Sequence, residues 1–481
     1  MTAGNVVLCC LDTVRADGFR EHAPRLRERA DLTYTECRAA SSWSVPSHAS
    51  MFTGALPHEH GVHTYERSFA GLDRADTFLG DLPDHRAVGA SANVWAGPIF
   101  GFDDLFDDFR AVSPDRRFPE GIDVGRFGQS VEATGLRKHL AFLRAALAHD
   151  HPLQSLANGA HVQVDDWLAR APLPKLTDDG AKTICREARA GALDGPEPFA
   201  LFANLMDAHG PLHHVRGYDR SLHDAPNAWT SADVDWSATV DALPDADAER
   251  EVARYRGLYA AAIDYLDRVV CDFVDDLQAA TDRPTTVVVT SDHGDNMGTP
   301  ADDGLWGHVE SSLTEGLLHV PLLVIEPDDG DGDDRPARTV TDRVSHTALP
   351  DLLVGLARGE RPDITGRPVR AERVGHSGRL ADVEERRGTH GDRTLRCVYD
   401  GDRKYVWDDR GGARAFALDP DRPCWQAAVE EDGAAEFDAA ALDAEHFGEP
   451  IEAFAERAAA AATAREVDDA TRERLAELGY V

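Results

Sequence analysis

Short runs of mostly apolar residues recur along the chain and are separated by longer amphipathic stretches. The runs cover residues 6–11, 87–94, 199–206, 286–290 and 320–325. A run that is apolar at nearly every position, rather than at every second one, is typical of a strand buried on both faces. Such strands alternating with helices predict an α/β fold, with a mostly parallel central sheet flanked by helices on both faces.

The clearest predicted helix covers residues 249–279, and Pro284 follows its end. Its apolar side chains recur at steps of three and four residues, which places them on one helical face: Leu258, Ala262, Leu266, Val269 and Phe273. Between the second and third strands, the segment of about residues 107–195 is polar and contains helical patches. We interpret that segment as a helical capping insertion.

The pattern changes near Arg387. Residues 393–418 alternate apolar and polar side chains, and Asp-Gly and Gly-Gly pairs interrupt them as hairpin turns do. An Ala-rich helix and a terminal helix ending at Leu478-Gly479 are expected to follow. We therefore predict a catalytic domain over residues 1–385, which includes the insertion, and a small C-terminal α+β subdomain of antiparallel sheet and helices over residues 386–481.

The charge balance excludes some classes of partner. The chain has 481 residues, of which 42% are hydrophobic, and it carries 86 acidic against 50 basic side chains, a net charge of −36. Nucleic-acid phosphates and anionic membranes would be repelled, so we expect no nucleic-acid partner. Only four basic residues are lysines (Lys138, Lys175, Lys182 and Lys404). An acidic, lysine-poor composition indicates a halophilic protein, whose excess charge is screened at high salt.

The cysteines and the N-terminus favour a reducing compartment. There are seven cysteines, an odd number without a CxxC pair, so we expect buried thiols rather than disulfides or a zinc site. The first residues lack the basic segment of a signal peptide. No run approaches the roughly 18 apolar residues that span a bilayer, so we expect no membrane insertion and a cytoplasmic location.

Three aspartates follow predicted strands. Asp12 and Asp292 come directly after a strand or one residue beyond it, as does Asp207, and His293 follows Asp292. The carboxyl ends of parallel strands form the ligand crevice of an open sheet. Because carboxylates crowded together repel one another, a bound divalent cation is the simplest reason to keep them there.

Pro46 fits the first position of a helix, which puts Ser44 at or just ahead of the start of that helix. We therefore expect Ser44 at the start of a short helix. Free N–H groups and the helix dipole stabilise an anion or an oxyanion nucleophile at that position. The alternative, that Ser44 is only a helix cap, remains open on this pattern alone.

Residues 44–54 resemble the signature of the sulfatase family in the alkaline phosphatase superfamily, Cys/Ser-x-Pro-Ser-Arg-x4-Thr-Gly. Four other segments resemble motifs of that family in the same order: LDTVRAD at 11–17, LMDAHGP at 205–211, TSDHGD at 290–295 and GHVESSLTEGLLHVPLLV at 307–324. The resemblance covers nearly the whole chain and implies an arylsulfatase-like protein with the alkaline-phosphatase-like sandwich fold.

The resemblance also implies the roles of individual residues. It makes Asp12, Asp292 and His293 metal ligands, together with Ser44, which is also the nucleophile. His209 and His308 would contact the transferred group or protonate the leaving oxygen, and His48 takes the place of an arginine of the oxyanion site. The implied cofactor is a divalent ion, for which we expect Ca²⁺, with Mn²⁺, Mg²⁺ and Zn²⁺ as alternatives.

Three positions differ from the family pattern: Thr13 stands in place of a second aspartate, Ser44 in place of the cysteine that maturation converts to formylglycine, and His48 in place of the arginine of the maturation signal. We therefore expect Ser44 to stay an unmodified serine.

The leading hypothesis is a metal-dependent sulfatase acting on a small-molecule or glycan sulfate ester. A plain serine suits phosphoryl chemistry, so a phosphodiesterase, phosphatase or phosphoryl-group transferase is the alternative. A catalytically silent protein that binds anionic glycans is the third hypothesis.

Overall fold

The computed structural model describes residues 4–113, 116–131, 136–169, 173–327, 337–377, 391–429 and 437–460. The predicted apolar runs form the centre of a nine-stranded sheet. Its order is β10 (Arg338–Val340), β2 (Leu32–Arg38), β9 (His319–Ile325), β6 (Thr285–Thr290), β1 (Asn5–Leu11), β5 (Phe199–Leu205), β3 (Arg86–Ser91) and β4 (Asp108–Ala111), and β11 (Val344–Ser345) pairs with β2.

The sheet is mostly parallel, which confirms the predicted α/β class. Strand β1 lies between β5 and β6 and is parallel to both, and β3 is parallel to β5 and β4. Strand β9 runs antiparallel to β2 and β6, which its apolar run did not reveal. The reason is that the chain stays at the carboxyl edge of β6 over residues 291–318 and enters β9 from that same edge.

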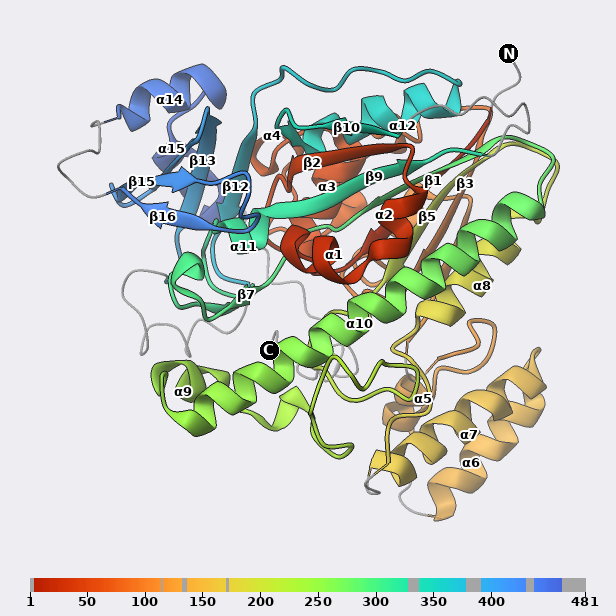
Figure 1. Cartoon of the computed structure of the whole chain (residues 1–481). Helices are drawn as coiled ribbons and strands as arrows, with labels where there is room; N and C mark the ends of the chain where they lie inside the picture. The colour runs from red at the N-terminus through yellow and green to blue at the C-terminus, as the bar shows by residue number, and fades with distance from the viewer. Residues whose placement is uncertain are drawn as a thin grey trace.

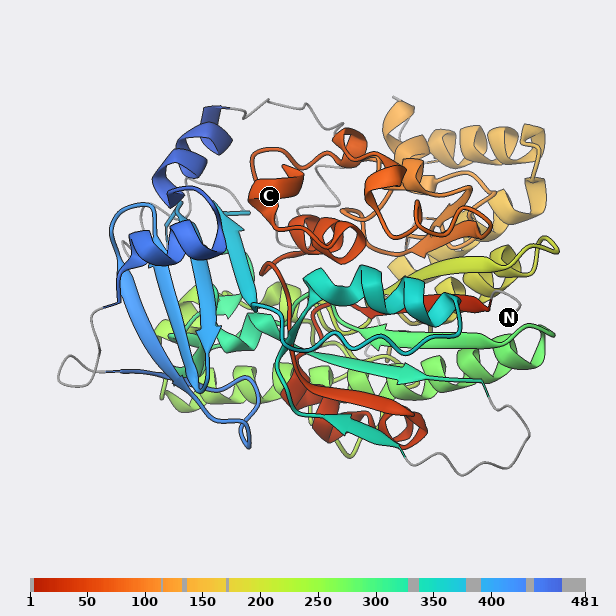
Figure 2. The same cartoon turned by 90° about the horizontal axis from the view of Figure 1, so that it is seen from above.

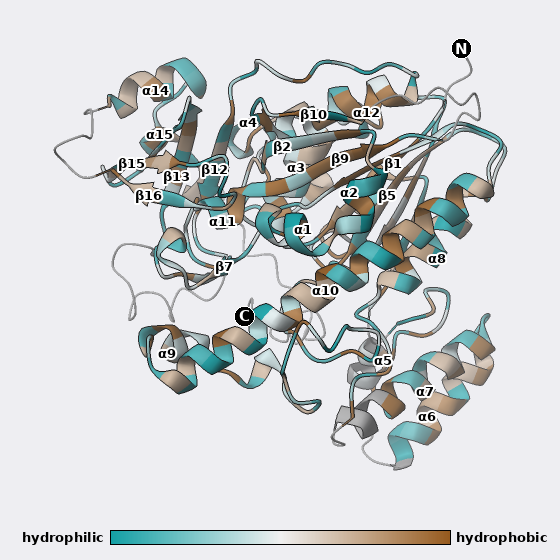
Figure 3. Ribbon diagram, in the orientation of Figure 1, coloured by the Kyte–Doolittle hydropathy of each residue, from teal (hydrophilic) through white to brown (hydrophobic). Residues whose placement is uncertain are grey.

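Each face of the sheet carries its own hydrophobic core. Alternate residues of β1 divide between them, so that Cys9 belongs to one core and Cys10 to the other. One core lies under α1 (Ala16–His22), α2 (Pro24–Arg29), α8 (Ala181–Ala192) and α10 (Ala246–Ala279), and the other under α3 (Ser44–Thr53) and α12 (Leu349–Ala357) (Figure 1). Polar residues lie on the outward sides of α1, α2 and α10 (Figure 3), whereas residues 44–52 of α3 are all buried.

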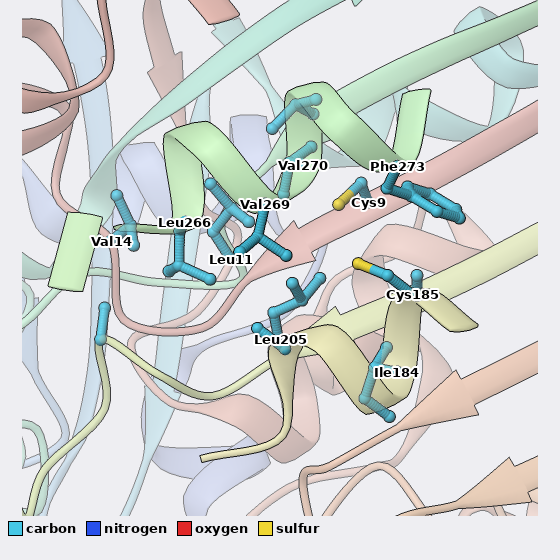
Figure 4. Packing of buried hydrophobic residues seen from close by; sticks show 14 of the residues in the cluster. Cys9, Leu11, Val14, Ile184, Cys185, Leu205, Leu266, Val269, Val270 and Phe273 are labelled. Carbon is cyan, nitrogen blue, oxygen red and sulfur yellow. The ribbon is translucent and has the colours of Figure 1, made fainter. Parts of the chain in front are cut away.

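The long helix α10 confirms the strongest helical prediction. It spans 34 residues from Ala246, and the side chain of its N-cap residue Asp245 accepts a hydrogen bond from the backbone N–H of Asp247. Its apolar stripe packs on the sheet, where Leu266, Val269 and Phe273 lie near Cys9 of β1 (Figure 4). This helix later supplies a side chain to the candidate site.

The predicted insertion contains helices. They are α5 (Val124–Ser130), α6 (Leu136–Ala148) and α7 (Pro152–Ala169), followed by α8. Helix α8 packs directly against one face of the large sheet and is not part of a cap, since Ile184 and Cys185 belong to the hydrophobic core on that face. Only α5 to α7 stand apart from the sheet, with α6 outermost (Figure 1).

A second sheet of five antiparallel strands lies beside one end of the large sheet (Figure 2). It comprises β12 (Arg370–Val374), β13 (Thr394–Asp400), β14 (Arg403–Asp408), β15 (Ala413–Leu418) and β16 (Gln426–Ala428). The predicted hairpins are confirmed. Because β12 precedes residue 386 and pairs with β13, this sheet begins earlier than the predicted subdomain. The division of the chain at 385/386 remains a prediction.

The remaining elements are short. They are α4 (Pro57–His60), α9 (Trp236–Asp241), α11 (Glu315–Leu318), α14 (Ala439–His446), α15 (Ile451–Ala460), β7 (Asn296–Met297) and β8 (Trp306–Gly307). The predicted terminal helix at 478–479 lies outside the described residues. All seven cysteines are buried and unbridged. Among the helices in the described ranges, none has the length and apolar content required to cross a bilayer.

Candidate active site

Two neighbouring strand ends bring acidic side chains together. Asp12 follows β1, and Asp292 and His293 follow β6. One ligand atom from each of these three residues lies within 4.8 Å of the other two, and all three side chains are fully buried. The carboxyl-edge argument from the sequence therefore holds for this trio.

Ser44 lies beside this trio at the first residue of α3. Its Oγ is 3.3 Å from Nε2 of His293. Asn93 donates from Nδ2 to Ser44 Oγ at 3.2 Å and to Oδ2 of Asp12 at 2.6 Å. Pro46 is the third residue of the helix rather than the first, and Ser44 occupies the first position. The side chain of Ser44 thus points into the acidic cluster from a helix N-terminus.

Thr13 takes part through its backbone. Its N–H donates to Oδ1 of Asp292 at 3.3 Å, and its Oγ1 donates to the carbonyl of Asp12 at 2.7 Å. Its φ of 60° lies in the left-handed region, which is costly for a β-branched residue. The turn after β1 is therefore held in a strained form that fits it between the two aspartates.

The residues present fit a divalent cation. Asp12 Oδ1 and Asp292 Oδ2 are buried and have no hydrogen-bond partner among the residues that the structure describes. Burial, and then the nearby charge of Asp292, raise the pKa of Asp12 well above its usual range. Two buried carboxylates this close repel each other, and a cation between them removes that cost. Oxygen ligands with one imidazole suit Ca²⁺, Mn²⁺, Mg²⁺ or Zn²⁺.

Asp207 does not join the cluster, contrary to the prediction for the three strand ends. Its carboxylate accepts hydrogen bonds from the backbone N–H groups of Asp179 and Ala181, both at 3.0 Å, at the start of α8. A carboxylate at a helix N-terminus is stabilised by the helix dipole. Asp207 therefore anchors α8 to the end of β5.

Three histidine rings form one wall of the site. The ring of His308 lies 4.6 Å from that of His293 and 5.1 Å from that of His209, between centroids. Burial lowers the pKa of His209 to about 3, and the pKa values of His293 and His308 to about 4. In the absence of substrate these rings are therefore neutral near pH 7.

Two further residues support this wall, and the sequence did not single them out. Asp295 Oδ1 is 2.9 Å from Nδ1 of His308, and the hydroxyl of Tyr255 donates to Asp295 Oδ2 at 3.1 Å. Asp295 is part of the TSDHGD segment, so its proximity to Asp292 was a usable signal. Tyr255 comes from the middle of α10, where the helical pattern predicts only a core position.

His48 lies behind Ser44 in the core. Its Nδ1 is 2.7 Å from the carbonyl of Ser44, and its Nε2 is 2.9 Å from Nδ2 of Asn204. The ring also packs edge-on against Phe102 and Phe202. Because both ring nitrogens are engaged, these contacts favour a role in positioning the nucleophile. A direct catalytic role for His48 stays a prediction.

Asn93 could have been found by the rule that identified Asp12. It stands two residues beyond β3, a parallel strand whose carboxyl end faces the same edge. A search of strand ends for acidic residues alone misses Asn93. An amide next to a carboxylate donates a hydrogen bond where a second acid would repel.

A mostly parallel sheet with helices on both faces, carrying a serine nucleophile candidate and an Asp/Asp/His cluster at its carboxyl edge, defines an alkaline-phosphatase-like hydrolase. The family model described as Sulfatase matches residues 4–359. The chain belongs to the sulfatase family.

Solved structures of similar fold span almost the whole chain. The phosphonate monoester hydrolase of Agrobacterium radiobacter is 17% identical, with 95% of each chain covered and a TM-score of 0.55. That of Silicibacter pomeroyi is 14% identical, with 94% of each chain covered and a TM-score of 0.53. A 2-O GAG sulfatase is 14% identical, with 97% of this chain and 95% of that chain covered and a TM-score of 0.53. No curated protein matches the chain. At these identities the likeness concerns the fold.

Proposed function

We propose that this protein is a divalent-cation-dependent hydrolase that cleaves sulfate esters of a small molecule or glycan, with Ser44 as the nucleophile. Membership of the sulfatase family supports the reaction class. The observation that carries the proposal is the convergence of Asp12, Asp292 and His293 within 4.8 Å beside the Ser44 hydroxyl.

Some residues of the site would bind the cation, and others would transfer protons. Asp12, Asp292 and His293 would hold the ion, which when bound lowers the pKa of a nearby hydroxyl and offsets charge on the transferred group. The Ser44 oxygen would form the new bond to sulfur while the bond from sulfur to the leaving oxygen breaks. Attack of water on that sulfur would then release sulfate and free Ser44. His308 or His209 would take up the proton that the Ser44 hydroxyl releases and deliver it to that leaving oxygen.

The charge balance supports one kind of ester over another. Two ligand carboxylates cancel a charge of +2, and the surrounding imidazoles are neutral because burial lowers the pKa of His209 to about 3 and that of His308 to about 4. Little positive charge is left for a second negative charge on the substrate. A sulfate monoester or a phosphodiester, each singly charged, is therefore favoured over a doubly charged phosphate monoester.

The second candidate is phosphodiester hydrolysis or phosphoryl transfer, and the identity of Ser44 favours it. A formylglycine hydrate can expel sulfate by re-forming its aldehyde, whereas a serine sulfate has no such exit. A serine phosphodiester or phosphomonoester can be hydrolysed by an activated water. Phosphonate monoester hydrolases are among the proteins of similar fold.

A panel of nitrophenyl esters tests the proposal. Sulfate, phosphodiester, phosphonate monoester and phosphate monoester substrates are compared, each with Ca²⁺, Mn²⁺, Mg²⁺ or Zn²⁺. We expect a singly charged ester to be turned over fastest, and Ser44→Ala to lower kcat by roughly a thousandfold or more.

Ser50→Ala is the matched control, because Ser50 lies on the same helix and contacts His60 instead of the cluster. Fastest turnover of the phosphate monoester would contradict the charge argument. Binding of sulfated glycans without turnover of any ester would support the catalytically silent alternative.

A further inference from the structure

A buried chain of three side chains reaches the active centre from α10. The hydroxyl of Tyr255 donates to Oδ2 of Asp295 at 3.1 Å, and Oδ1 of Asp295 is 2.9 Å from Nδ1 of His308. Tyr255 is 3% exposed, Asp295 4% and His308 7%. Hydrogen bonds so well shielded from water hold their partners firmly.

The backbone holds Asp295 and His308 opposite each other. Asn296 of β7 pairs with Gly307 of β8 in an antiparallel ribbon. Asp295 directly precedes one member of that pair and His308 directly follows the other, so the two side chains leave the ribbon at the same end. Their contact is therefore built into the strand register and does not depend on a flexible loop.

Aromatic packing fixes the position of Tyr255, the third side chain of this hydrogen-bonded chain. The ring of Tyr255 meets Trp306 edge-on at 4.8 Å and Trp236 at 5.1 Å, and the two indoles stack at 4.0 Å. Trp306 belongs to the same β8 strand that precedes His308. The tyrosine hydroxyl is thus directed at Asp295 by two indole rings, of which Trp306 belongs to the ribbon and Trp236 to α9.

We propose that Asp295 is a positioning residue that keeps a hydrogen on Nδ1 of His308, so that His308 acts on the substrate through Nε2, and that Tyr255 holds Asp295 in place. A carboxylate only accepts hydrogen bonds, so Nδ1 carries a hydrogen in both the neutral and the protonated ring. This inference rests on the proposed function, in which His308 serves the leaving oxygen.

The position of His308 in the candidate active site suits this role in proton transfer. Its ring is 4.6 Å from that of the candidate ligand His293 and 5.1 Å from that of His209. His308 takes up at Nε2 the proton that the Ser44 hydroxyl releases. When the bond to the leaving oxygen breaks, this proton passes from Nε2 to that oxygen, while Nδ1–H remains on Asp295. The wrong tautomer would present Nδ1 to Asp295 without a hydrogen and spoil the geometry.

Asp295→Asn is the decisive variant, because Tyr255 determines how the new amide points. Among the residues that the structure describes, the Tyr255 hydroxyl donates only to residue 295. It keeps that acceptor by pairing with the amide oxygen, which leaves the amide NH₂ facing Nδ1 of His308. The NH₂ group donates as well, which forces the hydrogen of a neutral His308 onto Nε2. Histidine side-chain nitrogen NMR on the full chain, assigned with His308→Gln, should show this change of tautomer.

The change of the His308 tautomer should also lower kcat. We expect Asp295→Asn to lower kcat by roughly 10²- to 10⁴-fold, with KM changed by less than about threefold. The loss should be larger for an alkyl ester than for a nitrophenyl ester, because only the poorer leaving group needs the proton. Tyr255→Phe alone should cost less than about tenfold, since the carboxylate remains.

The double variant Asp295→Asn/Tyr255→Phe gives the sharpest result. Without the tyrosine hydroxyl, the amide can turn its oxygen toward His308, and the Nδ1–H tautomer returns. We therefore expect kcat to recover by about tenfold or more relative to Asp295→Asn alone. A purely structural role predicts the opposite, a further loss.

Tyr265→Phe and Asp178→Asn are matched controls, because the hydroxyl of Tyr265 donates to Asp178 at 2.8 Å in a contact unconnected with the centre. They should leave the His308 tautomer and kcat unchanged. A wild-type His308 with its hydrogen on Nε2, or an Asp295→Asn variant with unchanged tautomer and kcat, would overturn the proposal. If the wild type turned over no ester, the proposed function would fail, and the NMR result would still decide the role of Asp295.

Discussion

Two buried imidazoles, those of His48 and His319, have both ring nitrogens engaged in contacts that suit a neutral tautomer, with one nitrogen donating and the other accepting. His319 is the clearest example outside the active centre. Its Nε2 is 2.8 Å from the carbonyl of Thr35, and its Nδ1 accepts from the backbone N–H of Cys424 at 3.4 Å. Burial, with the charge of Arg38 adding to it, lowers the pKa of His319 to about 3. A proton on Nδ1 would break the second contact.

His319 should make the fold sensitive to acid. An unfolded histidine has a pKa of about 6.5. The unfolded chain therefore binds more protons than the folded chain between pH 6.5 and about 3, and the stability that His319 contributes is full above pH 6.5 and is lost as pH falls. Between pH 7 and 5 this loss is about 2 kcal/mol. Urea unfolding at the two pH values measures it.

His319→Gln should reduce that pH dependence, because glutamine both donates and accepts without titrating. His139→Gln, on the exposed face of α6, is the control and should leave the dependence as it is in the wild type. An equal fall in the free energy of unfolding between pH 7 and 5 in His319→Gln and wild type would refute this account.

Strand ends are the elements that position the site, and the apolar pattern predicts them well. A strand that is buried on both faces is marked by its composition, so the positions of Asp12 and Asp292 follow from where β1 and β6 stop. The composition does not indicate, however, in which direction the side chain that follows a strand will point. Asp207 follows β5 and turns to α8 because unpaired backbone N–H groups lie there.

Partners that come from long-range packing could not be predicted from the chain. Tyr255 has the periodicity of any core residue of α10, and only the fold shows its hydroxyl on Asp295. His48 carries a motif position of the family and yet is enclosed by Phe102 and Phe202. Sequence motifs place a residue near a site, whereas its contacts decide whether it faces the substrate or the core.

Removal of a strand-end carboxylate should abolish the response to divalent ions. A bound ion at one hundred times its Kd stabilises a fold by about 2.7 kcal/mol. We expect Ca²⁺ to raise the Tm of the wild type, and Asp12→Asn and Asp292→Asn to lose that rise. Differential scanning calorimetry with and without the ion measures the effect.

Asp207→Asn is the matched control, since it removes a buried strand-end carboxylate that lies outside the cluster. It should lower Tm but keep the rise with Ca²⁺. An Asp12→Asn variant that responds to Ca²⁺, Mn²⁺, Mg²⁺ and Zn²⁺ as the wild type does would place the cation elsewhere.

Across the whole molecule, the acidic excess opposes the compact state. A net charge of −36 on one chain means that folding brings like charges together. Salt shortens the range of that repulsion, from about 10 Å at 0.1 M to about 3 Å at 1 M. The halophilic character predicted from composition concerns this balance between charge repulsion and its screening by salt. It does not bear on the fold class.

Stability should therefore rise with ionic strength. We expect Tm to increase as KCl is raised from roughly 0.1 M to 1 M, over which the screening length falls about threefold. Glucose at equal osmolality is the control, and it should produce a smaller rise because it does not screen charge. A Tm that stays constant or falls with KCl would contradict the halophilic interpretation.

The central claim is that Ser44, as an unmodified serine, attacks the substrate beside the Asp12–Asp292–His293 cluster. Acid quenching during turnover of the best ester, followed by peptide mass spectrometry of the segment containing Ser44, tests it most directly. We predict an unmodified serine before reaction and the added mass of the transferred sulfuryl or phosphoryl group on Ser44 after it. A formylglycine at position 44, or an adduct on another residue, would contradict the claim.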